Sequence, residues 1–352
     1  FTLRGLDRTT TVLAPWPGAP SVVATGTYGA SSVIFTTRAT VEDVTLLNTP
    51  GNGLALAATS GSAFNVTRVT LEAPALVTAG SGNSTCLTAS TSPGTMSAVR
   101  FEDSRCTHVQ EAMQLTSIDT VTVTDSTFDT TVRGLNLNNP GTTTIIGNTF
   151  TSAPQALLLQ QARGAVTVTS NSVTQGANGT TALSVTLRNQ SPTPAVTSVL
   201  SDNSVTLQGT SAIGVAAGFN AANGDLRIDG NLVVGSGGTQ VGIRLLATLA
   251  GVTGGNVRVQ NNVVRDVGSH ALHVLHADSY TRLDVFNNTL RAPAADTVSE
   301  SVINLGQRTT GASAPLNVIN NIVVGGGGTG VGVAYVPSLA PTRAHNLLFS
   351  VG

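Results

Sequence analysis

The chain has 352 residues, of which only 10% are charged, and its 17 basic and 18 acidic side chains leave a net charge of −1. This balance excludes the basic surface that nucleic acid or an anionic lipid surface requires. Hydrophobic residues make up 40% of the chain, enough for a core, yet no apolar run reaches the ~18 residues of a membrane helix. We expect no nucleic-acid partner and no membrane insertion.

One short pattern returns from residue 41 to the end of the chain. Two apolar residues stand one apart, a slot residue follows three positions later, and another apolar residue lies two positions beyond the slot. Val257, Val259, Asn262 and Val264 give a clear copy. A repeat of about 27 residues indicates a solenoid, a propeller or an array. The twelve slots are Val44, Val69, Ser104, Ser126, Asn148, Asn171, Asn203, Asn231, Asn262, Asn288, Asn321 and Asn346.

A second short strand follows each slot and reads small, apolar, any residue, apolar, as in Ala271-Leu272-His273-Val274. Alternation with a period of two predicts strands, and no sustained helical stripe is present. A propeller needs more strands per repeat, and a leucine-rich repeat needs more regular spacing. The sequence therefore predicts an all-β chain, a right-handed parallel β-helix of about 12 coils. We expect one domain over residues 1–352, with irregular coils in 1–40 and regular repeats in 41–352.

The slot asparagines would stack on one another at a bend of such a β-helix. Stacked amides donate to and accept from their neighbours, so they form a ladder. Leaving one buried amide unpaired costs ~1 to 3 kcal/mol, and the ladder would therefore oppose any slip of register. The predicted ladder residues are Asn148, Asn171, Asn203, Asn231, Asn262, Asn288, Asn321 and Asn346.

The frame, the Asn slot and the Gly-rich second strand resemble the right-handed parallel β-helix repeat proteins of bacteria, the superfamily that includes pectate lyases and polygalacturonases. The opening segment from Thr2 to Leu13 is similar to the start of such domains. The resemblance implies the fold over nearly the whole chain and a place outside the cell or in the cell envelope. The motifs of polygalacturonases and pectate lyases are absent, and the chain has no Lys. Because the chain starts and stops within the pattern, we expect the native protein to continue further.

Outward residues of the second strand are the candidate ligand-binding residues. This column contains Gln114, Asn136, Arg244, His273 and Asn304, beside a strip of Ala and Gly. Amides, Arg and His next to small residues would suit sugar hydroxyls or acid groups. The alternative interpretation, which we favour for the strip itself, is that small residues only let loops or a second chain pack closely.

Arg244, His273 and His270 are the catalytic candidates. A β-eliminating lyase needs a base to remove a proton next to a carboxylate and a cation to stabilise the resulting charge, and His and Arg can fill these roles. On an extended strand, however, His270 and His276 would face away from His273. Ordinary surface histidines remain the favoured interpretation.

Asp103 and Asp125 hold the same pattern position on adjacent coils, with Asp43 and Glu102 near them. Two close carboxylates could bind Ca²⁺ or act as an acid and base pair. Arg68 shares this position, so charge balancing at the surface is the favoured alternative. We expect no other cofactor.

Cys86 and Cys106 are the only cysteines. Cys106 takes the inward position that Leu71, Phe128 and Phe150 hold in other repeats, so we expect buried free thiols rather than a disulfide. The redox compartment stays open.

These observations favour a secreted or cell-surface module with a structural or adhesive role, whose partner is a polysaccharide or a surface protein. The alternative is a polysaccharide lyase or glycoside hydrolase that acts in a groove on the second-strand face. A third hypothesis is self-assembly through the ends of the coils.

Overall fold

The described part of the chain falls into two compact units. The computed structural model describes residues 2–9, 12–13, 31–35, 38–47, 52–57, 61–72, 85–90, 97–188, 197–220, 224–246, 254–291, 301–306, 315–325, 332–335, 339 and 341–350. The first unit is residues 1–164 and the second is residues 165–352. The prediction of a single domain stays a prediction. Within the described residues, no helix is both long enough and apolar enough to cross a membrane.

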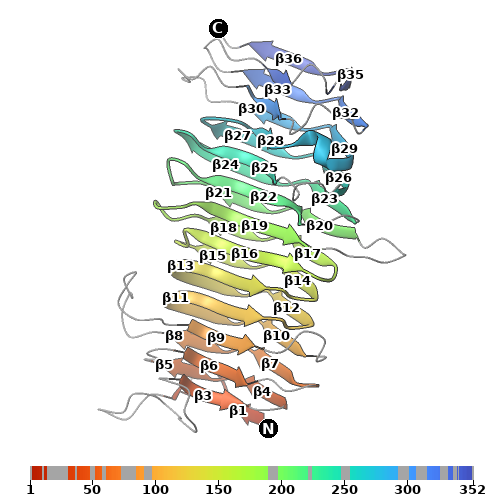
Figure 1. The fold of residues 1–352 in the computed structure, drawn as a ribbon. Coiled ribbons are helices and arrows are strands. Elements are labelled where there is room, and N and C mark those ends of the chain that lie inside the picture. Colours follow the sequence, from red (N-terminus) through yellow and green to blue (C-terminus); the bar gives the residue numbers. More distant parts are fainter. Residues whose placement is uncertain are drawn as a thin grey trace. The chain divides into compact units, whose positions relative to one another are not determined.

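Each coil of the first unit contributes strands to three parallel sheets (Figure 1). Sheet 1 holds the strands that precede the slots, sheet 2 the strands that follow them, and sheet 3 the second strands. In sheet 1 these are β1 (Thr2–Arg4), β4 (Arg38–Glu42), β7 (Ala63–Thr67), β10 (Ala98–Glu102), β12 (Thr120–Thr124) and β14 (Thr142–Ile146). Sheet 2 contains β2 (Val12–Leu13), β5 (Thr45–Leu47), β8 (Thr70–Glu72) and β15 (Thr149–Thr151), and sheet 3 contains β3 (Ser31–Phe35), β6 (Asn52–Ala57), β9 (Thr85–Ser90) and β16 (Gln155–Ala162). The long strands β11 (Arg105–Thr116) and β13 (Thr127–Asn138) run through both.

The second unit repeats this arrangement with separate strands in sheets 2 and 3 of every coil. Sheet 1 contains β17 (Val166–Thr169), β20 (Thr197–Ser201), β23 (Asp225–Asp229), β26 (Gly254–Gln260), β29 (Tyr280–Phe286), β32 (Leu316–Ile319) and β35 (Thr342–Ala344). Sheet 2 contains β18 (Ser172–Thr174), β21 (Ser204–Thr206), β24 (Leu232–Gly237), β27 (Val263–Val267), β30 (Thr289–Arg291), β33 (Ile322–Gly325) and β36 (Leu347–Ser350). Sheet 3 contains β19 (Thr181–Leu187), β22 (Ile213–Phe219), β25 (Val241–Leu246), β28 (Leu272–Val274), β31 (Ile303–Leu305) and β34 (Val333–Tyr335). One 3-10 helix, η1 (Ala277–Ser279), precedes β29.

Like positions of successive coils lie level with one another. In sheet 1, for example, Val257 pairs with Leu283 and Val259 pairs with Val285, all in parallel register. These apolar residues are buried, while the residues between them point outward, as the alternation predicted. The predicted all-β fold, a parallel β-helix, is confirmed in each unit.

The corner between sheets 1 and 2 is a left-handed turn that repeats in both units. The residue before the slot has a positive φ of 41 to 59° in Asp43, Arg68, Asp103 and Asp125 of the first unit and in Ser170, Asp202, Asn261, Asn287, Asn320 and His345 of the second; Gly147 and Gly230 take the same place at 69° and 66°. Among residues with a side chain, Asn and Asp enter this conformation most easily, which explains their frequency here.

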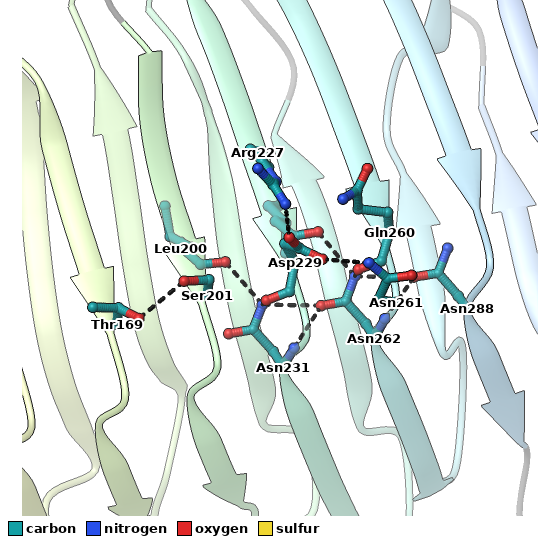
Figure 2. Close-up of polar contacts among 11 residues, drawn as sticks. Thr169, Leu200, Ser201, Arg227, Asp229, Asn231, Gln260, Asn261, Asn262 and Asn288 are labelled. Carbon is teal, nitrogen blue, oxygen red and sulfur yellow. Dashed lines mark hydrogen bonds and ion pairs between the residues drawn. The ribbon is translucent and has the colours of Figure 1, made fainter.

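The slot asparagines of the second unit form a continuous ladder, and Figure 2 shows its part from Asn231 to Asn288. The backbone N–H and the side-chain Nδ2 of Asn231 both donate to Oδ1 of Asn262, at 3.0 and 2.9 Å. Asn262 donates in the same way to Asn288. The other Nδ2 hydrogen of Asn262 points to the carbonyl oxygens of Ile228, at 3.0 Å, and Gln260, at 2.8 Å. The same amide-to-amide bonds link Asn171, Asn203, Asn231, Asn262, Asn288, Asn321 and Asn346.

The ladder prediction is therefore confirmed from Asn171 to Asn346, and its physical reason is the turn itself. The residue before each slot has a left-handed conformation, which turns the backbone N–H of the slot residue. That N–H then donates to the side chain of the next slot residue. All of these amides except Asn346 are buried, so each bond replaces one that water would otherwise make.

Slots of the first unit use hydroxyl groups for the same task. The N–H of Val69 donates to Oγ of Ser104, and the N–H of Ser104 donates to Oγ of Ser126, at 3.0 and 3.1 Å. The N–H of Ser126 then donates to Oδ1 of Asn148 at 3.0 Å. Each serine hydroxyl donates its single hydrogen to a carbonyl two residues earlier.

Cys86 and Cys106 form a disulfide bond, so the prediction of a free buried thiol is wrong. The Cα atoms lie 6.2 Å apart and both side chains are fully buried. In sheet 3, Thr85 pairs with Glu111 and Leu87 pairs with Met113, so Cys86 lies level with Ala112. Ala112 is the small residue that begins its second strand. Cys106 follows the next slot in sheet 2.

The small residues that begin each second strand face the interior, which corrects the idea that they form an outer strip. Ala112, Ala156, Ala182 and Ala271 are at most 1% exposed. A Cβ built on Gly134 would lie 2.7 Å from Cδ1 of Phe150, the residue two positions after the next slot. Small residues are therefore needed because sheet 2 of the following coil packs against them. Cys86 and Cys106 bridge this same contact.

Candidate functional site

The predicted binding residues lie on the outer side of sheet 3, but in two separate groups. In the second unit Arg244 pairs with His273, and His273 pairs with Asn304, so these three side chains occupy adjacent coils. Ala216 precedes Arg244 in this column. In the first unit Gln114 pairs with Asn136.

Arg244 is the most unusual member of the second group. Its side chain is half-buried, its Nε–H is enclosed, and it makes no hydrogen bond or ion pair with any described residue. Burial lowers the pKa of the Arg244 guanidinium from its usual value, because desolvation disfavours the charged form. Such a group favours an incoming anion, whose charge would replace the lost hydration.

The prediction that His270 faces away from His273 is wrong. Residues 268–271 form a bend before β28, and the bend brings the two imidazole rings to 4.8 Å between centroids. Alternation applies only to extended backbone, so it fails across this corner. His276 precedes η1, beyond the end of β28.

His270 has a defined protonation pattern. Its Nδ1 lies 2.6 Å from the carbonyl oxygen of Ser301, which can only accept, so Nδ1 carries the proton. Nδ2 of Asn304 lies 3.3 Å from Nε2 of His270 and donates to it. His270 is 7% exposed and therefore positions Asn304 rather than meeting solvent itself. We call Arg244, His270, His273 and Asn304 the sheet 3 cluster.

The first-unit group has a different character. Oε1 of Glu111 pairs with Nη1 of Arg133 at 3.1 Å, and Nδ2 of Asn136 donates to Oε2 at 3.4 Å. Gln114 is exposed beside them. Arg133 already pairs with the carboxylate of Glu111, so it attracts an incoming anion less strongly than Arg244 does.

Asp103 and Asp125 lie level at the left-handed corner. Both are exposed, and Oδ1 of Asp103 lies 3.6 Å from Nη1 of Arg8. In the same column, Arg68 donates to both carboxylate oxygens of Asp43, at 2.6 and 2.8 Å, which lowers the pKa of Asp43. The described residues contain no group of three or more His, Cys, Asp or Glu side chains arranged to hold a metal ion. The calcium prediction stays a prediction.

Sequence reasoning missed a polar pocket of 360 Å³ on the outer side of sheet 1. We call it the sheet 1 pocket. It spans four consecutive coils of the second unit, from β20 to β29. Its charged and amide residues are Asp225, Arg227, Asn256, Arg258, Arg282 and Asp284. The repeat could have predicted part of this pocket, since three of its residues hold the same outward position before successive slots: Arg227, Arg258 and Asp284.

Comparison with known proteins supports the fold and gives no closer relative. A family model described as a right-handed beta helix region matches residues 133–309, half of the chain. No curated protein and no solved structure matches the chain.

Proposed function

The chain belongs to the right-handed β-helix family, and on that premise we propose that it is an extracellular module that binds an acidic polysaccharide on the outer side of sheet 3. The single observation that carries this proposal is the half-buried, unpaired guanidinium of Arg244 in the sheet 3 cluster. A uronate carboxylate would satisfy it, since Arg presents its donors in a planar fork that matches a carboxylate.

Neighbouring groups supply the rest of the recognition. His273 and Asn304 stand on the next two coils, level with Arg244. Coils stack ~4.8 Å apart, close to the length of one sugar ring, so a glycan running along the column would meet one polar side chain per coil. Asn304 donates to His270 through Nδ2, which leaves its Oδ1 as an acceptor for a sugar hydroxyl.

An extracellular location is supported by the disulfide between Cys86 and Cys106. Disulfides persist in oxidising compartments and are rare in the cytosol. Labelling of free thiols in protein taken directly from the producing cells tests this part. Unlabelled cysteines in a secreted fraction are the expected result, and fully labelled cysteines in a cytosolic fraction would contradict it.

Calorimetry with polygalacturonate, and with amylose as the neutral control, tests the binding proposal. We expect binding of the acidic polymer alone, weakened about tenfold or more by Arg244→Ala, because a charge-assisted hydrogen bond contributes about 1.5 to 3 kcal/mol. Arg265→Ala is the matched control, since Arg265 is exposed in the same unit and already pairs with Asp266 at 2.8 Å. Equal affinity of both variants would refute the role of Arg244.

A polysaccharide lyase is the second candidate, favoured by the position of His273, which pairs in register with Arg244 and lies 4.8 Å from His270 between ring centroids. His273 would take the proton from the carbon next to the uronate carboxylate, and Arg244 would neutralise the growing charge. A carbon–carbon double bond would form as the carbon–oxygen bond to the leaving sugar breaks, which gives an unsaturated product, and the leaving oxygen would take a proton from water. Ultraviolet absorbance of that product, lost in His273→Ala, would establish this candidate. Binding without product release supports the adhesive module instead.

A further inference from the structure

The sheet 1 pocket lies on another sheet than the sheet 3 cluster and has its own chemistry. Three arginines and two aspartates line it, which gives one net positive charge. The described chain has few charged residues, so three arginines at one place are a local exception. Arg227 and Arg258 lie directly opposite each other on adjacent strands. Like charges in that position repel and destabilise a sheet.

Asp284 holds the neighbouring side chain of Arg282 in place. It is 2% exposed, and its oxygens accept from Nε of Arg282 at 3.0 and 2.8 Å. Nδ2 of Asn317 also donates to Oδ1 of Asp284, at 2.7 Å. The carboxylate is therefore already satisfied, and Arg258 reaches it only at 3.9 Å.

Arg258 is held in place but keeps its donors. Its guanidinium lies 5.8 Å from the centre of the Phe286 ring, a cation-π contact that orients the plane without using an N–H group. Arg227 donates one N–H group to Asp229 on its own strand (Figure 2). Both guanidinium groups retain further donors, because each has five N–H bonds.

Asp225 and Asn256, two residues before Arg227 and Arg258 on the same strands, present acceptors. Nδ2 of Asn256 donates to Oδ1 of Asp225 at 2.8 Å. This bond fixes the amide and leaves Oδ1 of Asn256 and Oδ2 of Asp225 as acceptors. Arg282 is level with Asn256, and Asp284 is level with Arg258, so both rows of the pocket hold charged groups. The free donors of Arg227 and Arg258, together with the acceptors of Asn256 and Asp225, match a molecule that carries both an oxyanion and hydroxyl groups.

We propose that the sheet 1 pocket is a second binding site, which takes one acidic sugar unit with its carboxylate between Arg227 and Arg258 and its hydroxyl groups against Asn256 and Asp225. The carboxylate relieves the repulsion between the two arginines. Asp284 is a positioning residue that holds Arg282 and does not contact the sugar. The site works independently of Arg244.

Titration of the whole chain with D-glucuronate, D-glucose and inorganic sulfate tests this proposal. We expect glucuronate to bind more tightly than either sulfate or glucose. Arg258→Ala should weaken glucuronate binding by about tenfold, as expected for the loss of a charge-assisted contact. Arg265→Ala should leave it unchanged. Arg244→Ala should retain the Arg258-dependent binding, so failure at one site is distinguishable from failure at the other.

Equal binding of sulfate and glucuronate would overturn the assignment to a sugar, and unchanged affinity in Arg258→Ala would overturn the site. The side chain of Arg258 is 52% exposed, so this variant should fold, as a circular dichroism melt will show. A measurement on the unaltered protein gives a second test. Side-chain signals of isotope-labelled arginine should shift with glucuronate for the residues of the pocket, and signals that do not move would contradict the proposal.

Discussion

The two units hold the same corner in register by different means. In the second unit, the side-chain Nδ2 of each of seven slot asparagines donates to a neighbouring amide oxygen or backbone carbonyl. In the first unit the slots at 104 and 126 are serines, whose single hydrogen leaves no second donor for the next coil. A disulfide and a stack of aromatic rings accompany these weaker slots.

The aromatic stack fills the interior beside the serine slots. Phe128 and Phe150 lie 5.0 Å apart between ring centres, and Phe101 lies 5.8 Å from Phe128. Valine or leucine holds the corresponding position two residues after each asparagine slot in the second unit up to residue 323: Val173, Val205, Val233, Val264, Leu290 and Val323. One fold thus specifies its register either through buried amides or through large interior groups and a covalent bond. Four predictions test this difference.

Asn262→Leu should have the largest effect. It removes the acceptor for two donors of Asn231 and the donor to Ile228, all buried. We expect a loss of about 3 to 5 kcal/mol in the free energy of unfolding, measured by urea denaturation. Asn262→Ser restores the hydroxyl pattern of the first unit and should lose less. Equal stability of wild type and both variants would refute the ladder.

Removal of the disulfide should rank next and act on the first unit. The bridge spans a sequence separation of 20, for which chain entropy predicts a contribution of about 3 kcal/mol. The Cys86→Ala, Cys106→Ala double variant should speed hydrogen exchange in β9 and β11. Exchange in β25 and β28 serves as the internal control. Uniform acceleration in both units would show that the bridge does not act locally.

Ser126→Asn converts a slot of the first unit to the pattern of the second. The new amide can accept from the N–H of Ser104, as Oγ does now, and can donate to Asn148. We expect a gain of about 1 kcal/mol in stability, the net contribution of one hydrogen bond. A loss of stability would mean that the neighbouring Phe128 leaves no room for the amide.

Asp43→Asn should have the smallest effect and should depend on pH. The pair with Arg68 lowers the pKa of Asp43, so the ionised carboxylate stabilises the fold above its ordinary pKa near 3.8. That contribution is lost as the pH falls from this value through the lower pKa of the folded state, because the unfolded chain takes up the proton first. Asn suits the left-handed corner, as Asn261 shows. Melting curves of the variant should therefore depend less on acidic pH than those of the wild type.

The candidate sites were predicted less completely than the fold. The outward column of sheet 3 placed Arg244, His273 and Asn304 correctly on adjacent coils. His270 was assigned to the wrong face because residues 268–271 bend. The sheet 1 pocket went unnoticed because its arginines are spaced like ordinary outward residues, and only the contacts of Arg258 and Arg282 with Asp284 and of Arg227 with Asp229 distinguish them.

The sequence alone determined the strand alternation, the position of every slot and the use of asparagine for the ladder, because these depend on local backbone geometry repeated in each coil. The tertiary structure decided what meets across corners and between coils. Cys86 reaches Cys106, and His270 reaches His273, only because turns reverse the alternation and insertions of different length separate the slots. Such contacts depend on the stacking of whole coils, which no short stretch of sequence contains.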